Sequence, residues 1–324
     1  MACAAPFPLA ARGTPLQPLD RLGAALGFQP GTLLAKRDDL TGLAGGGNKA
    51  RKLEYLVADA LAQGCDTLVT AGAAQSNHVR LTVAAARVAG LGCVAVLGGE
   101  RPERDEGNLV LDRLLGLEPV WVGAYDAYHL EEVLAETAVR LRAEGRRPYE
   151  IPLGGATPVG TMGYVAAADE LSAEAPGAVV YTATGTGGTQ AGLVVGLGTH
   201  ERVRGIDVGA VPDVASRIDL LIPAVAGLAG RPNPGGTLHL DHAQVGAGYA
   251  TGTDAAREAM ELAARHEGLV LDPVYTARAL AGLIADRRQG RLAPDHPVVF
   301  LHTGGLPSVF TERTVAWLTR ALGS

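Results

Sequence analysis

The chain has 324 residues, of which 47% are hydrophobic and 19% are charged, and its net charge is −6. This composition is typical of a globular protein too long for one small core, and it excludes a disordered or collagen-like chain. Because the charge is mild and the longest basic runs are pairs such as Arg146-Arg147, we expect no nucleic-acid partner.

Short apolar runs alternate with Ala- and Leu-rich segments along most of the chain. We expect strands at residues 67–70, 93–97, 119–122, 178–182, 203–208 and 298–302. We expect helices at residues 78–89, 130–143, 159–173, 190–197, 254–266, 276–288 and 307–322. Strands separated by helices of about ten or more residues predict parallel sheets, joined by crossover connections and covered on both faces.

Four loops are rich in Gly, Ser and Thr, at residues 72–77, 154–160, 184–192 and 303–307. In open α/β sheets, ligands bind beyond the carboxyl ends of the strands, where loops enter helices. Turn formation alone explains four loops of this composition poorly, so we interpret them as parts of a binding site.

The first motif is GGGNKARKLEYL, a glycine turn followed by Lys49 and Lys52. At a helix start, lysines three residues apart project from the same face. A lysine used for Schiff-base chemistry must lose its proton near neutral pH, which requires burial or a cationic neighbour such as Arg51 or Lys52. Taken alone, the segment is explained equally well as a glycine turn leading into a solvated basic helix.

The second motif, AGAAQSNHVR, follows a predicted strand and opens a predicted helix. Its polar residues are candidates for contacts with a cofactor or a substrate carboxylate. Ser76 or Asn77 can instead cap the helix through a side-chain oxygen. For His78, in the first turn of the helix, we favour a structural role over that of a general base.

The third motif, TGTGGTQAGL, also joins a strand to a helix. Its small residues expose backbone N–H groups at a helix N-terminus, which favours an anion, so residues 184–189 predict a phosphate cradle. The loop also matches a dinucleotide fingerprint in part, with Gln190 replacing the third glycine and Asp207 placed as a ribose-binding acid. A nicotinamide-dependent oxidoreductase therefore stays open as an alternative. There is no P-loop, since Gly47 is followed by Asn48.

Three further segments lie toward the C-terminus. Tyr249 occurs in GAGY, Tyr275 and Thr276 in LDPVYT, and Thr303 in HTGG. Each is weak evidence alone, because a buried phenol or a helix cap explains it as well.

Together, in this order, the motifs resemble the fold-type II pyridoxal-phosphate (PLP) enzymes, and within them the family of D-cysteine desulfhydrase and 1-aminocyclopropane-1-carboxylate (ACC) deaminase. The resemblance extends from about residue 33 to residue 310. It implies an α/β fold similar to the tryptophan synthase β subunit, with two three-layer domains and largely parallel sheets. It places residues 1–54 and 161–324 in a larger PLP-binding domain and residues 55–160 in a smaller inserted one.

The resemblance also implies roles for individual residues. Lys49 is similar to the lysine that attaches PLP, and Lys52 to a lysine that reaches the phosphate. Ser76 resembles an active-site serine that binds substrate or assists proton transfer, and Tyr249 and Tyr275 resemble two tyrosines that face the substrate. The other implied PLP contacts are Asn77 at the 3-hydroxyl, Thr184, Gly185, Thr186, Gly187, Gly188, Thr189, Thr276 and Thr303. The implied substrate contacts are Gln75, Ser76, Asn77 and His78, and no metal is implied.

Two positions favour the desulfhydrase side of this family. ACC deaminases have Glu directly after the second tyrosine and Leu before the glycine pair, where this chain has Thr276 and Thr303. A carboxylate near the pyridine nitrogen keeps it protonated and strengthens the electron sink, whereas a threonine hydroxyl can leave it neutral. β-Elimination with a good leaving group needs less carbanion stabilisation than opening a cyclopropane.

The expected reaction is therefore conversion of D-cysteine to pyruvate, sulfide and ammonia by a PLP-dependent lyase. β-Elimination from L-cysteate or from another specialised amino acid stays open, and ACC deamination is less favoured. Neither the handedness of the substrate nor the leaving group is fixed by these motifs.

The last expectations concern where the protein is located in the cell and how many subunits it has. The first residues lack the apolar stretch of a secretory signal, and no segment approaches the roughly 18 apolar residues of a membrane span. The cysteines Cys3, Cys65 and Cys93 form no CxxC pair, so we expect reduced thiols, with the last two buried beside strands. We expect a cytoplasmic enzyme, and the resemblance implies a homodimer.

Overall fold

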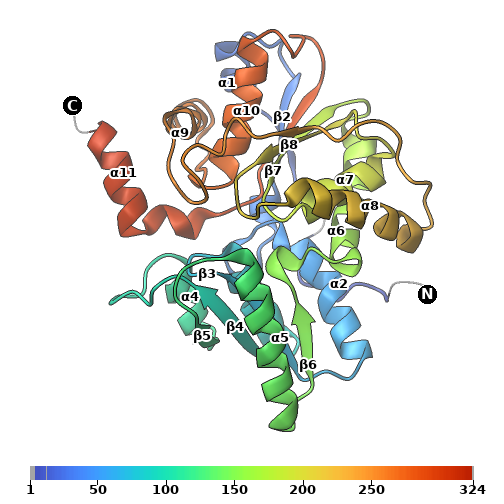
Figure 1. Ribbon diagram of the computed structural model, residues 1–324. Coiled ribbons are helices and arrows are strands. Elements are labelled where there is room, and N and C mark those ends of the chain that lie inside the picture. The colour runs from blue at the N-terminus through green and yellow to red at the C-terminus, as the bar shows by residue number, and fades with distance from the viewer. Residues whose placement is uncertain (1–3, 12, 323–324) are drawn as a thin grey trace.

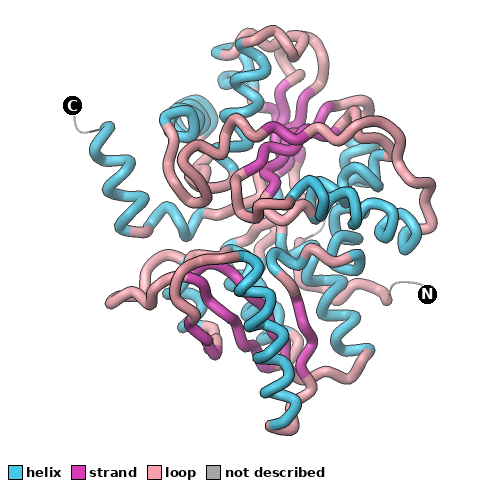
Figure 2. Tube along the Cα trace, in the orientation of Figure 1, coloured by secondary structure: helices cyan, strands magenta, loops and turns pink. Residues whose placement is uncertain are grey.

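The computed structural model describes residues 4–11 and 13–322, and its strands form two separate sheets (Figures 1 and 2). The strands are β1 (Leu16–Pro18), β2 (Leu33–Lys36), β3 (Thr67–Ala73), β4 (Gly92–Gly98), β5 (Glu118–Trp121), β6 (Pro148–Ile151), β7 (Val179–Thr184), β8 (Val203–Asp207), β9 (Leu240–Asp241) and β10 (Val298–Leu301). The helices are α1 (Asp20–Ala25), α2 (Lys49–Ala62), α3 (Asn77–Val88), α4 (Asn108–Leu114), α5 (Ala127–Ala143), α6 (Pro158–Glu174), α7 (Gly188–Leu197), α8 (Val214–Ala229), α9 (Asp254–Glu267), α10 (Thr276–Arg288) and α11 (Glu312–Leu322).

Both sheets are largely parallel, which confirms the predicted class. The larger has the order β1-β2-β10-β7-β8-β9, and only the β1–β2 pair is antiparallel. The smaller has the order β5-β4-β3-β6 and is parallel throughout. Its strands all come from residues 67–151, which interrupt the larger sheet along the chain. The domain bounds at residues 55 and 160 stay a prediction.

Alternate residues of the strands bury side chains on opposite faces of each sheet. In β10, Val299 packs in a core with α6, α7 and α8, whereas its neighbour Phe300 packs in a core with α9 and α10. In β3, Val69 packs against α5, whereas Leu68 packs against α2 and α3. Because both positions are apolar, each sheet is covered by helices on both faces, which gives two three-layer units.

The structure refines several predicted elements. All six predicted strands and the predicted helices are present, and α2 begins at Lys49 as its motif indicated. The helix predicted at residues 307–322 is wrong in part: a 3₁₀ turn at Leu306–Phe310 is followed by the separate helix α11. The break lies at Thr311, whose backbone is extended and whose Oγ1 accepts a hydrogen bond from Thr314 N. This is the geometry of a helix N-cap.

A buried polar cluster fixes helix α2 against the rest of the larger unit. Asp38, which is fully buried, accepts hydrogen bonds from Arg51 Nε (2.9 Å) and Nη2 (2.9 Å). Its two oxygens also accept from Thr14 Oγ1 (2.7 Å) and Tyr164 Oη (2.6 Å). On its other side the Arg51 guanidinium pairs with Glu170 of α6 at 2.7 Å. The cluster therefore joins α2 and α6 to the segment after β2.

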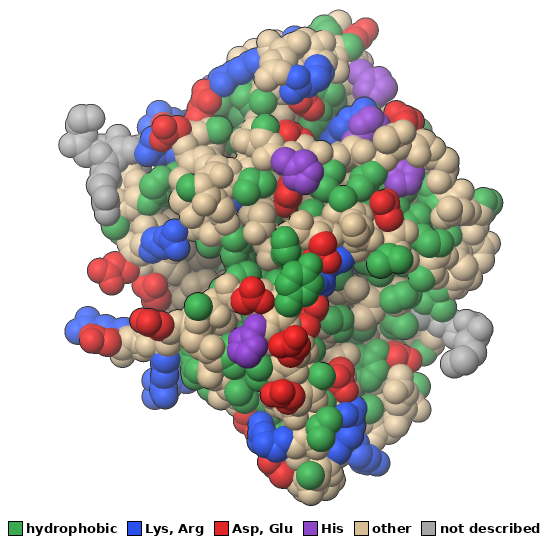
Figure 3. All heavy atoms as spheres, in the orientation of Figure 1, with side chains coloured by type: hydrophobic (Ala, Val, Ile, Leu, Met, Phe, Trp, Pro, Cys, Tyr) green, Lys and Arg blue, Asp and Glu red, His purple; other side chains and the backbone are tan. Residues whose placement is uncertain are grey.

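Charged side chains of both signs are scattered over the face seen in Figure 3. Within residues 4–11 and 13–322, no helix is long and apolar enough to span a membrane. Cys93 is buried in β4 and Cys65 is only half-buried, so the expected burial is confirmed for Cys93 alone. Cys3 lies outside the described residues.

Removing the carboxylate at the centre of the cluster should destabilise the fold strongly. Asp38→Ala leaves the buried Arg51 guanidinium short of a counter-ion, so we expect a loss of about 3–5 kcal/mol in the free energy of unfolding. Chemical denaturation measures it. Glu144→Ala is the control, because its ion pair with Arg140 is half exposed, and it should cost less than about 1 kcal/mol. Equal losses in the two variants would contradict the anchoring role of Asp38.

Candidate active site

A pocket lies between the two sheets, where the carboxyl ends of parallel strands from both face one another. Loops after β3, β6, β7 and β10 line it, so the structure brings together all four glycine-rich loops singled out from the sequence. The predicted site residues that line the pocket are Lys49, Lys52, Ser76, Asn77, His78, Thr184, Gly185, Thr186, Gly187, Gly188, Thr189, Tyr249, Tyr275 and Thr303. Gln75 and Thr276 are not among the lining residues.

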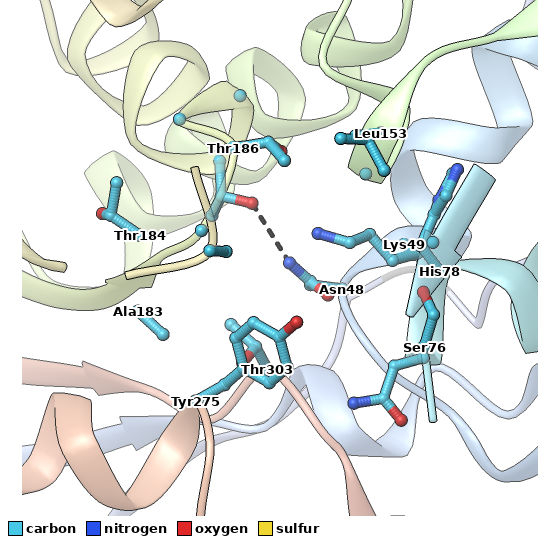
Figure 4. Close-up of a pocket in the computed structure, with 18 of the residues that line it drawn as sticks. Asn48, Lys49, Ser76, His78, Leu153, Ala183, Thr184, Thr186, Tyr275 and Thr303 are labelled. Atoms are coloured by element: carbon cyan, nitrogen blue, oxygen red, sulfur yellow. Dashed lines mark hydrogen bonds between the residues drawn. The ribbon is translucent and has the colours of Figure 1, made fainter. Parts of the chain in front are cut away.

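Lys49 projects into the pocket from the start of α2 (Figure 4). The preceding residue, Asn48, ties this helix start to two other loops: its backbone N–H donates to Thr303 O (3.0 Å), and its Nδ2 donates to Thr189 Oγ1 (3.1 Å). Burial lowers the pKa of the Lys49 amine to about 8. About a tenth of the amine is thus unprotonated at pH 7, which supplies the free amine that a nucleophilic lysine requires.

Lys52 lies one turn further along the same face of α2. Burial, and then the nearby charge of Lys49, lower its pKa well below the usual value. Of the two cationic neighbours considered for Lys49, Arg51 does not serve, because its guanidinium points to the opposite side of α2 and pairs with Asp38 and Glu170. Residues two apart on a helix project in nearly opposite directions, so Lys52 is the neighbour on this face.

The loop between β7 and α7 makes a tight approach to Lys52. Gly187 has a left-handed backbone (φ 85°), and a Cβ on Gly188 would lie 2.6 Å from Lys52 Nζ. Lys52 Nζ donates a hydrogen bond to Gly154 O at 3.2 Å. The N-terminus of α7 is the positive end of the helix dipole, and a lysine beside it is unfavourable unless an anion lies between them. This corner of the pocket is therefore built for an anionic group.

The start of α3 forms the opposite wall, with Ser76 and His78 facing Lys49 (Figure 4). Ser76 is the N-cap, accepting a hydrogen bond from Val79 N at 3.3 Å, so it both caps the helix and lines the pocket. His78 Nε2 lies 2.9 Å from Thr70 Oγ1, whose own proton goes to Ile151 O. His78 must therefore donate from Nε2. Burial, and then the charges of Lys49 and Lys52, lower its pKa well below the usual value, so the ring is neutral.

Three tyrosines close the pocket on the side of the larger sheet. The hydroxyls of Tyr249 and Tyr275 lie 2.5 Å apart. Tyr125, which the sequence analysis missed, packs its ring 5.2 Å from that of Tyr249 and donates a hydrogen bond to Ala210 O. Its only signal in the sequence was its position just after a predicted strand. Burial raises the pKa of all three phenols, so they are protonated hydroxyls.

Three polar residues prove to be turned away from the pocket. The side-chain amide of Gln75 donates a hydrogen bond to Glu106 O and accepts one from Asn108 N. Thr276 Oγ1 donates to Asp272 Oδ1 at 2.7 Å behind the pocket wall, which leaves Thr303 as the threonine of this pair that lines the pocket. Asp207 is paired with His242 at 2.7 Å and does not line the pocket, so it does not serve as the acid of a dinucleotide site.

Comparison with known proteins gives a consistent result. The family model described as pyridoxal-phosphate dependent enzyme matches residues 8–304. The chain is 44% identical over 308 residues to a D-cysteine desulfhydrase of Salmonella paratyphi C (strain RKS4594), covering 92% of this chain and 93% of the relative. It is 42% identical over the same length to a D-cysteine desulfhydrase of Salmonella schwarzengrund (strain CVM19633), with the same coverage.

Solved structures show the same fold. A crystal structure of an ACC deaminase homologue superposes with a TM-score of 0.89 at 37% identity, covering 98% of this chain and 96% of that one. Processed threonine deaminase isoform 2 from Solanum lycopersicum has a TM-score of 0.70 at 16% identity, covering 98% and 85%, and shows the fold alone. The predicted resemblance and fold are thus confirmed, and the nicotinamide alternative is excluded. The chain belongs to the family of pyridoxal-phosphate dependent enzymes.

Proposed function

We propose that this protein is a PLP-dependent carbon–sulfur lyase that converts D-cysteine and water to pyruvate, hydrogen sulfide and ammonia at the pocket between the sheets. The observation that carries the proposal is the convergence of Lys49 and Lys52 on the glycine loop at the start of α7. The relatives named D-cysteine desulfhydrase at 42% and 44% identity support this substrate.

The residues of the pocket fit PLP. The phosphate suits the corner between Lys52 and the start of α7, where glycines keep the backbone accessible and a dianion offsets the buried ammonium and the helix dipole. Residues 184–189 would bind this phosphate, and Lys49 would attach the cofactor. Asn77 would contact the 3-hydroxyl, and Thr303 would lie at the ring nitrogen. Thr276 would not contact PLP directly, because its hydroxyl is bonded to Asp272 behind the pocket wall.

Bound PLP supplies an electron sink that makes the Cα–H bond of an attached amino acid acidic. Lys49 Nζ is released when the amino group of the substrate takes its place, and the freed amine then removes that proton, since its lowered pKa leaves part of it unprotonated near neutral pH. The start of α3, with Ser76 and Asn77, binds the substrate carboxylate, which the positive end of the helix favours. His78, which is neutral because of its burial and is oriented by its hydrogen bond to Thr70, supports this wall without taking the proton.

The paired tyrosine hydroxyls suit the departure of sulfur. Tyr249 and Tyr275 are protonated and hydrogen-bonded to each other. One hydroxyl can therefore donate a proton to the leaving sulfide while the other holds it in position through their shared hydrogen bond. Their rings and that of Tyr125 also exclude water from this side of the pocket. Water enters the balance only after the carbon–sulfur bond breaks, when hydrolysis of the remaining three-carbon unit gives pyruvate and ammonia.

We also infer a cytoplasmic homodimer, as the family resemblance implies. Leu306, Phe310 and Val315 expose 45%, 66% and 46% of their surface at the start of the C-terminal segment, which supports a subunit contact there.

Substrate preference is tested by pyruvate release from a panel of amino acids. We expect D-cysteine to be turned over fastest, β-chloro-D-alanine to react because chloride is a good leaving group, and ACC to give no product. L-Cysteine, β-chloro-L-alanine and L-cysteate complete the panel. Faster turnover of L-cysteate or of ACC would overturn the assignment of substrate while leaving a PLP enzyme.

Replacing Lys49 should abolish both the attachment of the cofactor and turnover. Lys49→Ala removes the amine that binds PLP covalently and takes the proton, so we expect loss of the visible absorption band that borohydride bleaches and a fall in activity of at least about 10³-fold. Lys52→Ala is the matched variant from the same face of α2. It should keep the band at saturating PLP but weaken cofactor binding. Full activity of Lys49→Ala would disprove the scheme.

The reactivity of Lys49 should report its lowered pKa. The chain has only three lysines, Lys36, Lys49 and Lys52, so peptide mapping after treatment with an amine-reactive reagent is simple. In cofactor-free protein the labelling rate of Lys49 should rise with pH and level off above about pH 8, because only the neutral amine reacts. Lys36 is buried and paired with Glu174 at 2.7 Å, so it should label only on unfolding. A midpoint for Lys49 above pH 10 would contradict its burial.

A further inference from the structure

We propose that Asn108 is a positioning residue that fixes the side-chain amide of Asn77 with its oxygen toward α4 and its nitrogen toward the pocket. The functional consequence rests on the proposed function, in which the 3-oxygen of PLP lies beside Asn77. Asn108 is the first residue of α4, is fully buried and does not line the pocket.

The orientation is set by a backbone carbonyl, which can only accept. Asn108 Nδ2 lies 2.9 Å from Gln75 O, so this atom must be the NH₂ group of Asn108. Its second proton points to Asn77 Oδ1 at 3.0 Å. The atom of Asn77 that faces Asn108 must therefore be its oxygen, and the other branch of the planar amide, Nδ2, is the one presented to the pocket.

Gln75 holds the two segments in register. Its Oε1 accepts from Asn108 N (2.9 Å) and its Nε2 donates to Glu106 O (3.0 Å), so backbone groups fix this amide as well. Gly107, between them, has φ 53°, and a Cβ there would lie 2.5 Å from Gln75 Oε1. Glu106 is held in turn by Glu312 N of α11 at 2.6 Å. Gln75, which we expected to contact the substrate, is thus part of a clamp behind the pocket wall that consists of Gln75, Glu106 and Asn108.

Because the clamp binds Asn77 Oδ1, the group that Asn77 presents to the pocket is the hydrogen-bond donor Nδ2. A donor stabilises the anionic form of an oxygen and an acceptor stabilises its protonated form. With Asn108 in place, Asn77 would offer the 3-oxygen of bound PLP a donor that favours its anionic form. If Asn108 becomes an acceptor, Asn77 turns its NH₂ group toward it and presents Oδ1 to the pocket.

The test is a pH titration of the visible absorption band of the holoenzyme. Asn108→Asp keeps the shape of the side chain, replaces the donor with an acceptor and adds a negative charge. We expect the pH midpoint of the band to rise by about one unit, a tenfold change in the proton equilibrium, and the affinity of the cofactor-free protein for PLP to fall about tenfold. In an Asn77→Ala background only the part of this shift that comes from the charge of the new carboxylate should remain.

A merely structural role predicts a different pattern. Leu109→Ala, at the next residue of α4 and also buried, is the control: it should lower thermal stability without moving the midpoint. An unchanged midpoint in Asn108→Asp, or a shift that is equally large without the Asn77 amide, would overturn the inference. If Asn108→Asp does not fold, Asn108→Ala carries the same comparison, with a smaller shift in the same direction. Absence of a visible band in the wild-type protein overturns the proposed function itself, and this inference with it.

Discussion

The ion pair between Arg51 and Asp38 is the constraint on which the geometry of the site depends. Arg51 is followed directly by Lys52 and lies two residues after Lys49, so fixing its guanidinium fixes the rotation of α2 about its axis. With that side chain pointed toward Asp38 and Glu170, the face that carries both lysines has to point into the space between the sheets. Asp38 accepts four hydrogen bonds from three residues, which compensates for the burial of its charge. The glycine turn before Lys49 then brings the helix start to the loop after β10.

The sequence was informative about this site because its signals were local. Glycine-rich loops at the ends of apolar strands are recognised from spacing, and the parallel topology guarantees that such loops meet at one edge of a sheet. That is why the residues of four loops were predicted and are found together in one pocket. Helix α8 escaped prediction because Pro223 interrupts its pattern, and α4 because it has only two turns.

What the sequence could not predict is which way each polar side chain points. Gln75, Ser76, Asn77 and His78 are consecutive, yet the structure turns Gln75 toward Glu106 and Asn108 while the other three line the pocket. The partners lie about 30 residues away along the chain, so no local pattern contains them. Tyr125 was missed for the same reason, because its partners Tyr249 and Ala210 belong to the other sheet's loops. Side-chain direction depends on tertiary contacts that spacing does not encode.

The direction of one buried carboxylate sharpens the argument for elimination over ring opening. Asp272 lies close enough to the loop after β10 that a Cβ on Gly305 would be 2.7 Å from its side chain. All its acceptor capacity is nevertheless used inward, on the backbone N–H groups of Val274, Tyr275 and Thr276 and on the Thr276 hydroxyl. Thr276 thus does not replace a pocket carboxylate with a pocket hydroxyl. It keeps a neighbouring carboxylate engaged at the start of α10, where the helix dipole stabilises it. The polar side chain left at this wall is that of Thr303, a neutral hydroxyl that can accept or donate. In the proposed arrangement, a ring nitrogen at Thr303 would meet no negative charge that holds a proton on it. The weaker electron sink that would result suffices where a thiolate departs, and it would be a poor match for a reaction that must break a carbon–carbon bond.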